Sequence, residues 1–293
     1  MKILFPNHPQ KARLPDPDYE SEYDAALGAG FECELYSLED LRAGDVARAI
    51  RLCASASRAN ETIVHRGWMM SDVLYSTLFD ALATKGYLPL STPRQYAQAH
   101  YLPNAYKLLQ GETPESVWVE GRDIAGAWEK YMEIGQPAAI VKDYVKSAKH
   151  RWKEACFIPS GTDRPRFEEI LKAFLETRGN LFEKGIVLRR FHEFVKLADD
   201  IRGQPVHEEY RLFMLRGALL AGTPAIRGAG PFGNLAEWEA IARRFENPFI
   251  SMDIARQENG AWLIVEVGDG GVSGLPSSIE PSDFYRTLYE RTK

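Results

Sequence analysis

Strand-like and helix-like segments alternate over the first third of the chain, and this order constrains the fold more than any other feature. FECELYSL at 31–38 alternates apolar and polar residues as a strand does, and Ser71 caps an amphipathic helix after the next strand. Strands that alternate with helices form layers in which helices cover a sheet. We therefore expect a small N-terminal α/β domain over residues 1–95. Its strand candidates are MKILF (1–5), FECELYSL (31–38) and ETIVHRG (61–67).

After residue 95 the pattern changes to strands with fewer helices between them. The segment RFEEILKAFLETR at 166–178 carries apolar residues at helical spacing. Asn259 and Gly260 separate two strand-like runs, which is a strong signal for a β-hairpin. We therefore expect an α+β region with mostly antiparallel strands over residues 96–293. Its strand candidates are VWVEG (117–121), AAIVKDYVK (138–146), EACFIP (154–159), GIVLRRF (185–191), EEYRLFMLRGALL (208–220), FISMDIARQ (249–257) and AWLIVEVG (261–268).

The composition is that of a soluble globular protein. The net charge of -5 argues against general binding to nucleic acid or to an anionic membrane. No apolar run approaches the roughly 20 residues that span a bilayer, and the N-terminus lacks the features of a signal peptide. The cysteines are odd in number and far apart, so we expect no disulfide framework and a cytoplasmic location. The motifs GxxxxGK[ST], HExxH and GxSxG are absent.

A basic segment, AAIVKDYVKSAKHRWK at 138–153, concentrates positive charge in an acidic protein. If its start is extended, Lys142 and Lys146 project from one face about 13 Å apart, at roughly 3.3 Å per residue. One lysine would lie near the inner phosphates of a nucleotide and the other toward the following loop, where Lys149 adds charge. An exposed basic hairpin, or a helix with a solvated lysine stripe, explains the segment equally well.

Arg211 lies in EEYRLFMLRG, where alternation places it on one strand face with Glu209. A forked, permanently charged guanidinium suits a phosphoryl oxygen or a carboxylate. An ordinary cross-strand ion pair explains the same residues without a ligand.

Two acids face one another across the predicted hairpin. With Asn259 and Gly260 in the turn, Asp253 lies directly opposite Glu266, and Asp269 follows in a glycine-rich turn. Facing carboxylates repel unless a cation lies between them or one is protonated. Mg²⁺, held by one or two carboxylates with phosphate oxygens and water, fits such a place. The alternative is a solvent-exposed acidic pair, which strands this apolar disfavour.

Two further segments offer ligand contacts. The backbone after the strand GIVLRRF suits an adenine ring, with Arg190 or Glu193 beside the nucleotide; a surface edge strand is the alternative. Arg66 ends a strand of the N-terminal domain, where open α/β sheets usually bind ligands. Arg66 is therefore a candidate substrate contact, unless its loop is merely packed.

The order of these segments resembles that of ATP-grasp enzymes. The resemblance covers nearly the whole chain and depends on the combined order, with VKDYVKS, HRGWMM and IVEVGDGGVSGLP similar to the R2K clade. It implies an ATP-grasp fold in which the α/β part at 1–95 is a pre-ATP-grasp domain. Residues 96–293 would then form the nucleotide-binding and catalytic domain.

The resemblance also implies roles for the candidate residues. Lys142 would contact the inner phosphates, Arg211 the γ-phosphate or an acyl-phosphate, and Asp253 and Glu266 would hold Mg²⁺. Many ATP-grasp strands end Glu-x-Asn, whereas Gly268 stands at that place here and Asp269 follows as the candidate substitute. The full set of candidates is Arg211 and Lys146 for catalysis, Lys142, Lys149, Arg190, Glu193 and Arg211 for ATP, Asp253, Glu266 and Asp269 for the metal, and Arg66 for the substrate.

Members of this family typically activate a carboxylate as an acyl-phosphate that an amine attacks, with release of ADP and phosphate. The expected function is thus an ATP- and Mg²⁺-dependent carboxylate–amine ligase acting on small-molecule or peptide substrates, with neither membrane nor nucleic acid as the expected partner. Two alternatives remain open. One is a polynucleotide ligase or phosphotransferase of the same fold, and the other is a nucleotide-binding module without catalysis.

Overall fold

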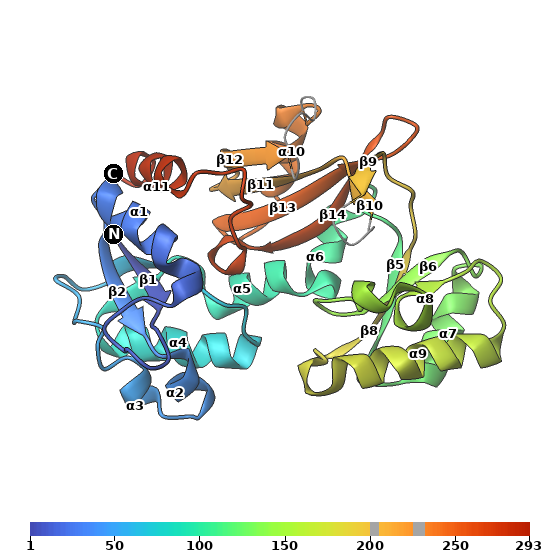
Figure 1. Ribbon diagram of the computed structural model, residues 1–293, viewed down its shortest axis with the longest axis horizontal. Coiled ribbons are helices and arrows are strands. Elements are labelled where there is room, and N and C mark those ends of the chain that lie inside the picture. Colours follow the sequence, from blue (N-terminus) through green and yellow to red (C-terminus); the bar gives the residue numbers. More distant parts are fainter. Residues whose placement is uncertain (200–204, 225–231) are drawn as a thin grey trace. The chain divides into compact units, whose positions relative to one another are not determined.

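The computed structural model describes residues 1–199, 205–224 and 232–293, which form two compact units (Figure 1). The first unit contains residues 1–99, 208–254 and 266–293, and the second contains residues 100–207 and 255–265. Both contain sheets and helices, so the mixed α/β and α+β fold predicted from the sequence is confirmed. The functional division expected near residue 95 stays a prediction.

A parallel sheet with the strand order β2-β1-β3-β4 forms the N-terminal layer of the first unit. Its central strand β1 is buried along its whole length, as expected for a strand covered on both faces. The elements of this layer are β1 (Lys2–Pro6), α1 (Glu20–Ala29), β2 (Glu32–Tyr36), α2 (Leu38–Arg42), α3 (Val46–Ala49), β3 (Glu61–His65), α4 (Asp72–Thr84), β4 (Tyr87–Pro89) and α5 (Pro93–His100).

Local sequence signals set the ends of these helices. Ser71 Oγ accepts a hydrogen bond from the Leu74 amide at 3.3 Å, so the serine caps α4 as predicted. The helix α1 ends at Gly30, whose φ of 100° is a left-handed conformation that glycine adopts without a steric penalty.

The second sheet of this unit has the order β12-β11-β13-β14. Arg216 and Gly217, both with positive φ, make the tight turn between β11 and β12, and the adjacent strands β13 and β14 confirm the predicted hairpin. The final helix lies beside α1, and its Phe284 packs in one core with Phe5 and Phe213 (Figure 1). The elements are β11 (Glu209–Leu215), β12 (Ala218–Pro224), α10 (Leu235–Ala242), β13 (Phe249–Arg256), β14 (Trp262–Asp269), η4 (Gly270–Val272) and α11 (Pro281–Glu290).

The second unit is built on an antiparallel sheet with the order β5-β8-β6-β7. Helix α9 buries Phe167, Ile170, Leu171, Phe174 and Leu175 against it, the apolar face predicted from helical spacing. None of the helices in the described ranges has the length and apolar character needed to cross a bilayer. The elements are α6 (Leu102–Leu109), β5 (Ser116–Glu120), α7 (Ile124–Glu133), β6 (Ala139–Asp143), η2 (Lys149–Arg151), α8 (Trp152–Ala155), β7 (Phe157–Ile158), α9 (Arg164–Arg178), β8 (Gly185–Arg190), β9 (Lys196–Asp199) and β10 (Pro205–His207).

Candidate functional site

A pocket of about 350 Å³ opens on the second sheet of the first unit. Arg211 on β11 and Asp253 on β13 supply its charged lining, together with Glu209. The glycine-rich segment after β14 supplies the remaining wall. The lining residues are Glu209, Arg211, Asp253, Gly274, Leu275, Pro276 and Ser277.

Arg211 and Asp253 form a two-pronged ion pair in this pocket. Arg211 Nε donates to Asp253 Oδ1 at 2.7 Å, and Nη2 donates to Oδ2 at 2.6 Å. The remaining Nη1 donates to the carbonyl oxygen of Gly274 at 3.1 Å. The Asp253 side chain is 8% exposed and that of Arg211 is 34% exposed, so the guanidinium remains accessible from the pocket.

Glu266 lies close to this pair. A Cβ built on Gly268 would lie 3.3 Å from Ser251 Oγ, and one built on Gly270 would lie 2.8 Å from the Phe249 ring. These two contacts set Gly268 beside Ser251 and Gly270 beside Phe249, so the two-residue period turns Glu266 to the same strand face as Asp253. The turn itself differs from the predicted one, because the Gln257 amide donates to the Ala261 carbonyl oxygen at 2.8 Å. Hydrogen bonding to Asp253 raises the pKa of Arg211, and the charges of Glu266 and Glu209 raise this pKa further.

Asp269 does not join these acids. Its carboxylate accepts hydrogen bonds from Asn247 Nδ2 at 2.7 Å and from the Gly271 amide at 2.8 Å, and burial raises its pKa. It is 2% exposed, and the alternation of β14 turns it to the face opposite Glu266. Over the ranges that the structure describes, no three His, Cys, Asp or Glu side chains are grouped to hold a metal.

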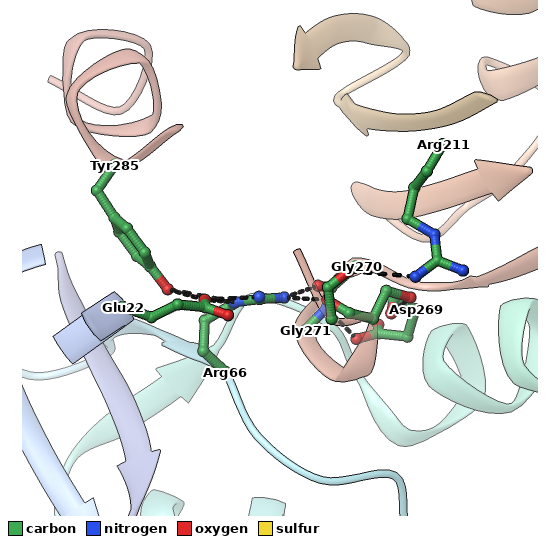
Figure 2. Close-up of polar contacts among 9 residues, drawn as sticks. Glu22, Arg66, Arg211, Asp269, Gly270, Gly271 and Tyr285 are labelled. Carbon is green, nitrogen blue, oxygen red and sulfur yellow. Dashed lines mark hydrogen bonds and ion pairs between the residues drawn. The ribbon is translucent and has the colours of Figure 1, made fainter. Parts of the chain in front are cut away.

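Arg66, expected at the substrate, is fully buried at the end of β3. Its guanidinium pairs with Glu22 at 2.6 Å (Figure 2). Arg66 is not among the residues that line the pocket. The structure therefore gives Arg66 a packed position, the alternative that the sequence left open.

The basic segment lies in the second unit, and its strand is shorter than expected. β6 ends at Asp143 because its carboxylate accepts hydrogen bonds from the amides of Val145 and Lys146 at 2.7 and 2.6 Å, which turns the chain. The predicted extended face with Lys142 and Lys146 is thus wrong. Lys142 is buried on the strand, Lys146 is half-buried in the turn, and Lys149 is exposed in η2. The predicted strand EACFIP is likewise reduced to β7, because its start forms α8.

The predicted adenine segment follows β8 in the same unit. Arg190 pairs with Glu115 at 2.6 Å, and Glu193 is exposed. Next to it, Phe191 contacts Phe157 edge-on at 5.2 Å, and Phe157 stacks on Trp152 at 5.3 Å. The sequence showed no periodic pattern for this half-buried aromatic group, because its members come from α8, β7 and the segment after β8. By contrast, Glu209 could have been assigned to the pocket from its alternation with Arg211.

Comparisons with known proteins agree on the fold. A family model described as "ATP-grasp domain, R2K clade family 3" matches residues 133–288. A RimK domain ATP-grasp protein from Sphaerobacter thermophilus superposes with a TM-score of 0.60 at 15% identity, covering 99% of this chain and 98% of its own. D-cycloserine synthetase DcsG gives a TM-score of 0.59 at 14% identity, and the match covers 100% of this chain and 99% of its own.

The ATP-grasp ligase PsnB, solved with a minimal precursor, Mg and ADP, gives a TM-score of 0.57 at 13% identity, covering 99% of this chain and 96% of its own. No match was found among curated proteins. Together the family match and the full-length superpositions confirm the expected ATP-grasp fold.

Proposed function

Because the chain belongs to family 3 of the R2K clade of ATP-grasp domains, we propose that it is an ATP- and Mg²⁺-dependent ligase joining a carboxylate to an amine. The observation that supports this proposal is the ion pair of Arg211 and Asp253 in the pocket, together with the charge of Glu266, which raises the pKa of Arg211. An accessible guanidinium next to paired carboxylates suits a metal-bound phosphoryl group.

The donor set of the pocket fits Mg²⁺. Two carboxylates suffice when phosphate oxygens and water complete the shell, and we assign them to Asp253 and Glu266. Both oxygens of Asp253 accept from Arg211, but each keeps a further lone pair for a cation. We assign Asp269 to holding the loop, because Asn247 and the Gly271 amide already occupy its carboxylate.

In the second unit we propose that Lys142, Lys146 and Lys149 neutralise the ATP phosphates. The aromatic group of Trp152, Phe157 and Phe191, beside Arg190 and Glu193, supports an adenine site, since bases stack on aromatic rings.

The reaction proceeds in two steps. A carboxylate oxygen of the first substrate attacks the γ-phosphorus, the bond from that phosphorus to the bridging oxygen breaks, and ADP leaves. The amine then attacks the acyl carbon of the acyl-phosphate, phosphate leaves, and the nitrogen loses a proton. Arg211 stabilises the phosphoryl oxygens in both steps, and Mg²⁺, when bound, neutralises charge on the transferred group.

We propose small-molecule or peptide substrates and a cytoplasmic reaction. D-cycloserine synthetase and PsnB with its precursor are examples of both substrate classes on this fold.

The test is the thermal unfolding midpoint with ATP or ADP, each with and without Mg²⁺. We expect stabilisation that needs Mg²⁺, because a ligand at 100 times its dissociation constant adds about 2.7 kcal/mol. Glu266→Ala should lose the effect, and Glu258→Ala, at the exposed tip of the same hairpin, should keep it.

Stabilisation that persists without Mg²⁺ or in Glu266→Ala would contradict the metal assignment. Release of AMP in place of ADP during turnover would favour a polynucleotide ligase or phosphotransferase. Binding without turnover across a panel of carboxylates and amines would favour a nucleotide-binding module.

A further inference from the structure

Arg66 is a fully buried cation, and every nitrogen of its guanidinium donates a hydrogen bond. Nε and Nη2 donate to Glu22 Oε2 at 3.0 and 2.6 Å. Nη1 donates to the carbonyl oxygens of Gly270 and Ser273, the latter at 2.8 Å. Tyr285 Oη donates to the same Glu22 oxygen at 2.7 Å, which closes the network from α11 (Figure 2).

The same guanidinium connects the two elements that carry the pocket. Its central carbon lies 5.9 Å from the ring of Phe213 on β11, two residues after Arg211. On its other side it holds the loop whose next carbonyl, that of Gly274, accepts from Arg211. Arg66 therefore contacts both the strand and the loop that place Arg211 in the pocket.

The loop fits closely against the end of β3. The Gly67 amide donates to the carbonyl oxygen of Gly271 at 2.9 Å. A Cβ on Gly271 would lie 2.5 Å from the backbone oxygen of His65, so only glycine fits at this approach. The edge where an open α/β sheet usually binds a ligand is thus filled by the protein's own loop.

We propose that Arg66, held by Glu22 and Tyr285, is a positioning residue that fixes the loop 270–277 beside Arg211. A guanidinium suits this role because its rigid fork serves one carboxylate and two carbonyls at once, which the compact ammonium of lysine does not. The expected effect of Arg66 on nucleotide affinity rests on the proposed function. The expected effect of Arg66 on the order of the loop does not.

The experiment compares Tyr285→Phe and Glu22→Gln with wild type by amide hydrogen exchange of the loop and by calorimetric titration with ADP and Mg²⁺. Tyr285→Phe loses one buried hydrogen bond, which changes an equilibrium by about tenfold, so we expect loop exchange about tenfold faster and a correspondingly weaker affinity. Glu22→Gln leaves the buried guanidinium without its counter-charge, so we expect a larger effect on both measurements. The matched control is Tyr131→Phe, which loses hydrogen bonds to the Pro137 and Pro159 carbonyls in the second unit.

The control should lower the unfolding midpoint while leaving loop exchange and affinity as in wild type. Loop exchange that stays at the wild-type rate in folded Tyr285→Phe overturns the proposal, and so does an equal increase in Tyr131→Phe. If wild type binds no nucleotide, the proposed function fails, but the exchange measurement still decides whether Arg66 orders the loop.

Discussion

Glu266 and Asp269 are two acids of one strand whose side chains have different surroundings. They lie three residues apart on β14, so the two-residue period turns them to opposite faces. Glu266 lies beside the accessible Arg211, whereas Asp269 is enclosed by Asn247 and the Gly271 amide. One carboxylate therefore lies beside the guanidinium of the pocket, and the other stabilises the backbone that surrounds it.

Gly271 should tolerate no side chain. Its Cβ would lie 2.5 Å from the His65 carbonyl oxygen and 2.8 Å from Asp269 Oδ1, so Gly271→Ala should destabilise the protein by roughly 1–3 kcal/mol through overpacking. Gly274→Ala is the control, because a Cβ there meets nothing within 4 Å. Urea unfolding of both variants checks this, and equal midpoints would contradict the steric argument.

His65 should make stability depend on pH. Burial, aided by the charge of Arg66, lowers its pKa to about 3. Within the described residues its Nδ1 has no hydrogen-bond partner, so the folded state has no acceptor for a second proton. The unfolded state takes up that proton below about pH 6.5, so stability should fall from there to pH 3 by up to about 1.4 kcal/mol per pH unit.

The check is the difference in unfolding free energy between wild type and His65→Gln from pH 7 to pH 4. The raised pKa of Asp269 has the opposite effect on stability: it stabilises the folded protein at low pH, and this stabilisation is lost as pH rises. Both proteins contain Asp269, so its contribution cancels when their unfolding free energies are subtracted. Parallel pH profiles for the two proteins would exclude His65 as the source.

At the scale of elements, the sequence predicted those structural features that depend only on residues close together in the chain. The periodicity of α9, the cap of α4 and the hairpin signal near Gly260 act within a few residues, and each is confirmed. The predicted two-residue turn is wrong, because the Gly260 amide donates to the Gln257 carbonyl oxygen and the loop has three residues. The end of β6 was missed, because alternation continues in the sequence past Asp143 while its carboxylate turns the chain.

Asp143 should stabilise the turn that ends β6 next to Lys142. Its side chain is fully buried and accepts from Arg178 Nε at 2.7 Å as well as from two amides of the turn. Asp143→Ala leaves a largely buried guanidinium unpaired, so we expect a loss of about 3–5 kcal/mol. Asp143→Asn keeps an acceptor and should lose less.

The control for this prediction is Glu168→Ala. It breaks surface ion pairs with Arg164 and Lys172 on α9, and such pairs contribute about 0.3–0.5 kcal/mol each on a helix. Chemical denaturation of the three variants gives the ranking, and an Asp143→Ala protein as stable as Glu168→Ala would refute it.

At the scale of the whole molecule, each unit is assembled from separated parts of the chain. The first unit combines three segments and the second combines two. The network of Arg66 illustrates why its partners could not be predicted from sequence, because Glu22 lies 44 positions before it and Tyr285 lies 219 positions after it. No local pattern predicts such partners, whereas the order of strands and helices did predict the fold.

A core substitution should therefore loosen distant segments together. Leu288 on α11 is fully buried, and Leu288→Ala should cost about 2–5 kcal/mol. We expect faster amide exchange in all three segments of the first unit, 1–99, 208–254 and 266–293, and unchanged exchange in the second.

Leu171→Ala, at an equally buried site on α9, is the reciprocal control and should affect 100–207 and 255–265. Faster exchange confined to α11 itself in Leu288→Ala would show that the three segments do not unfold as one cooperative body.

The split of the first unit has a consequence during protein synthesis. Arg66 and Glu22 leave the ribosome long before Tyr285, and at about 5–20 residues per second the interval is on the order of ten seconds or more. During that time the nascent N-terminal layer displays the apolar side chains of Phe5 and Phe31, which α11 later covers. The emerging chain should accordingly be a client of molecular chaperones until its last helix docks.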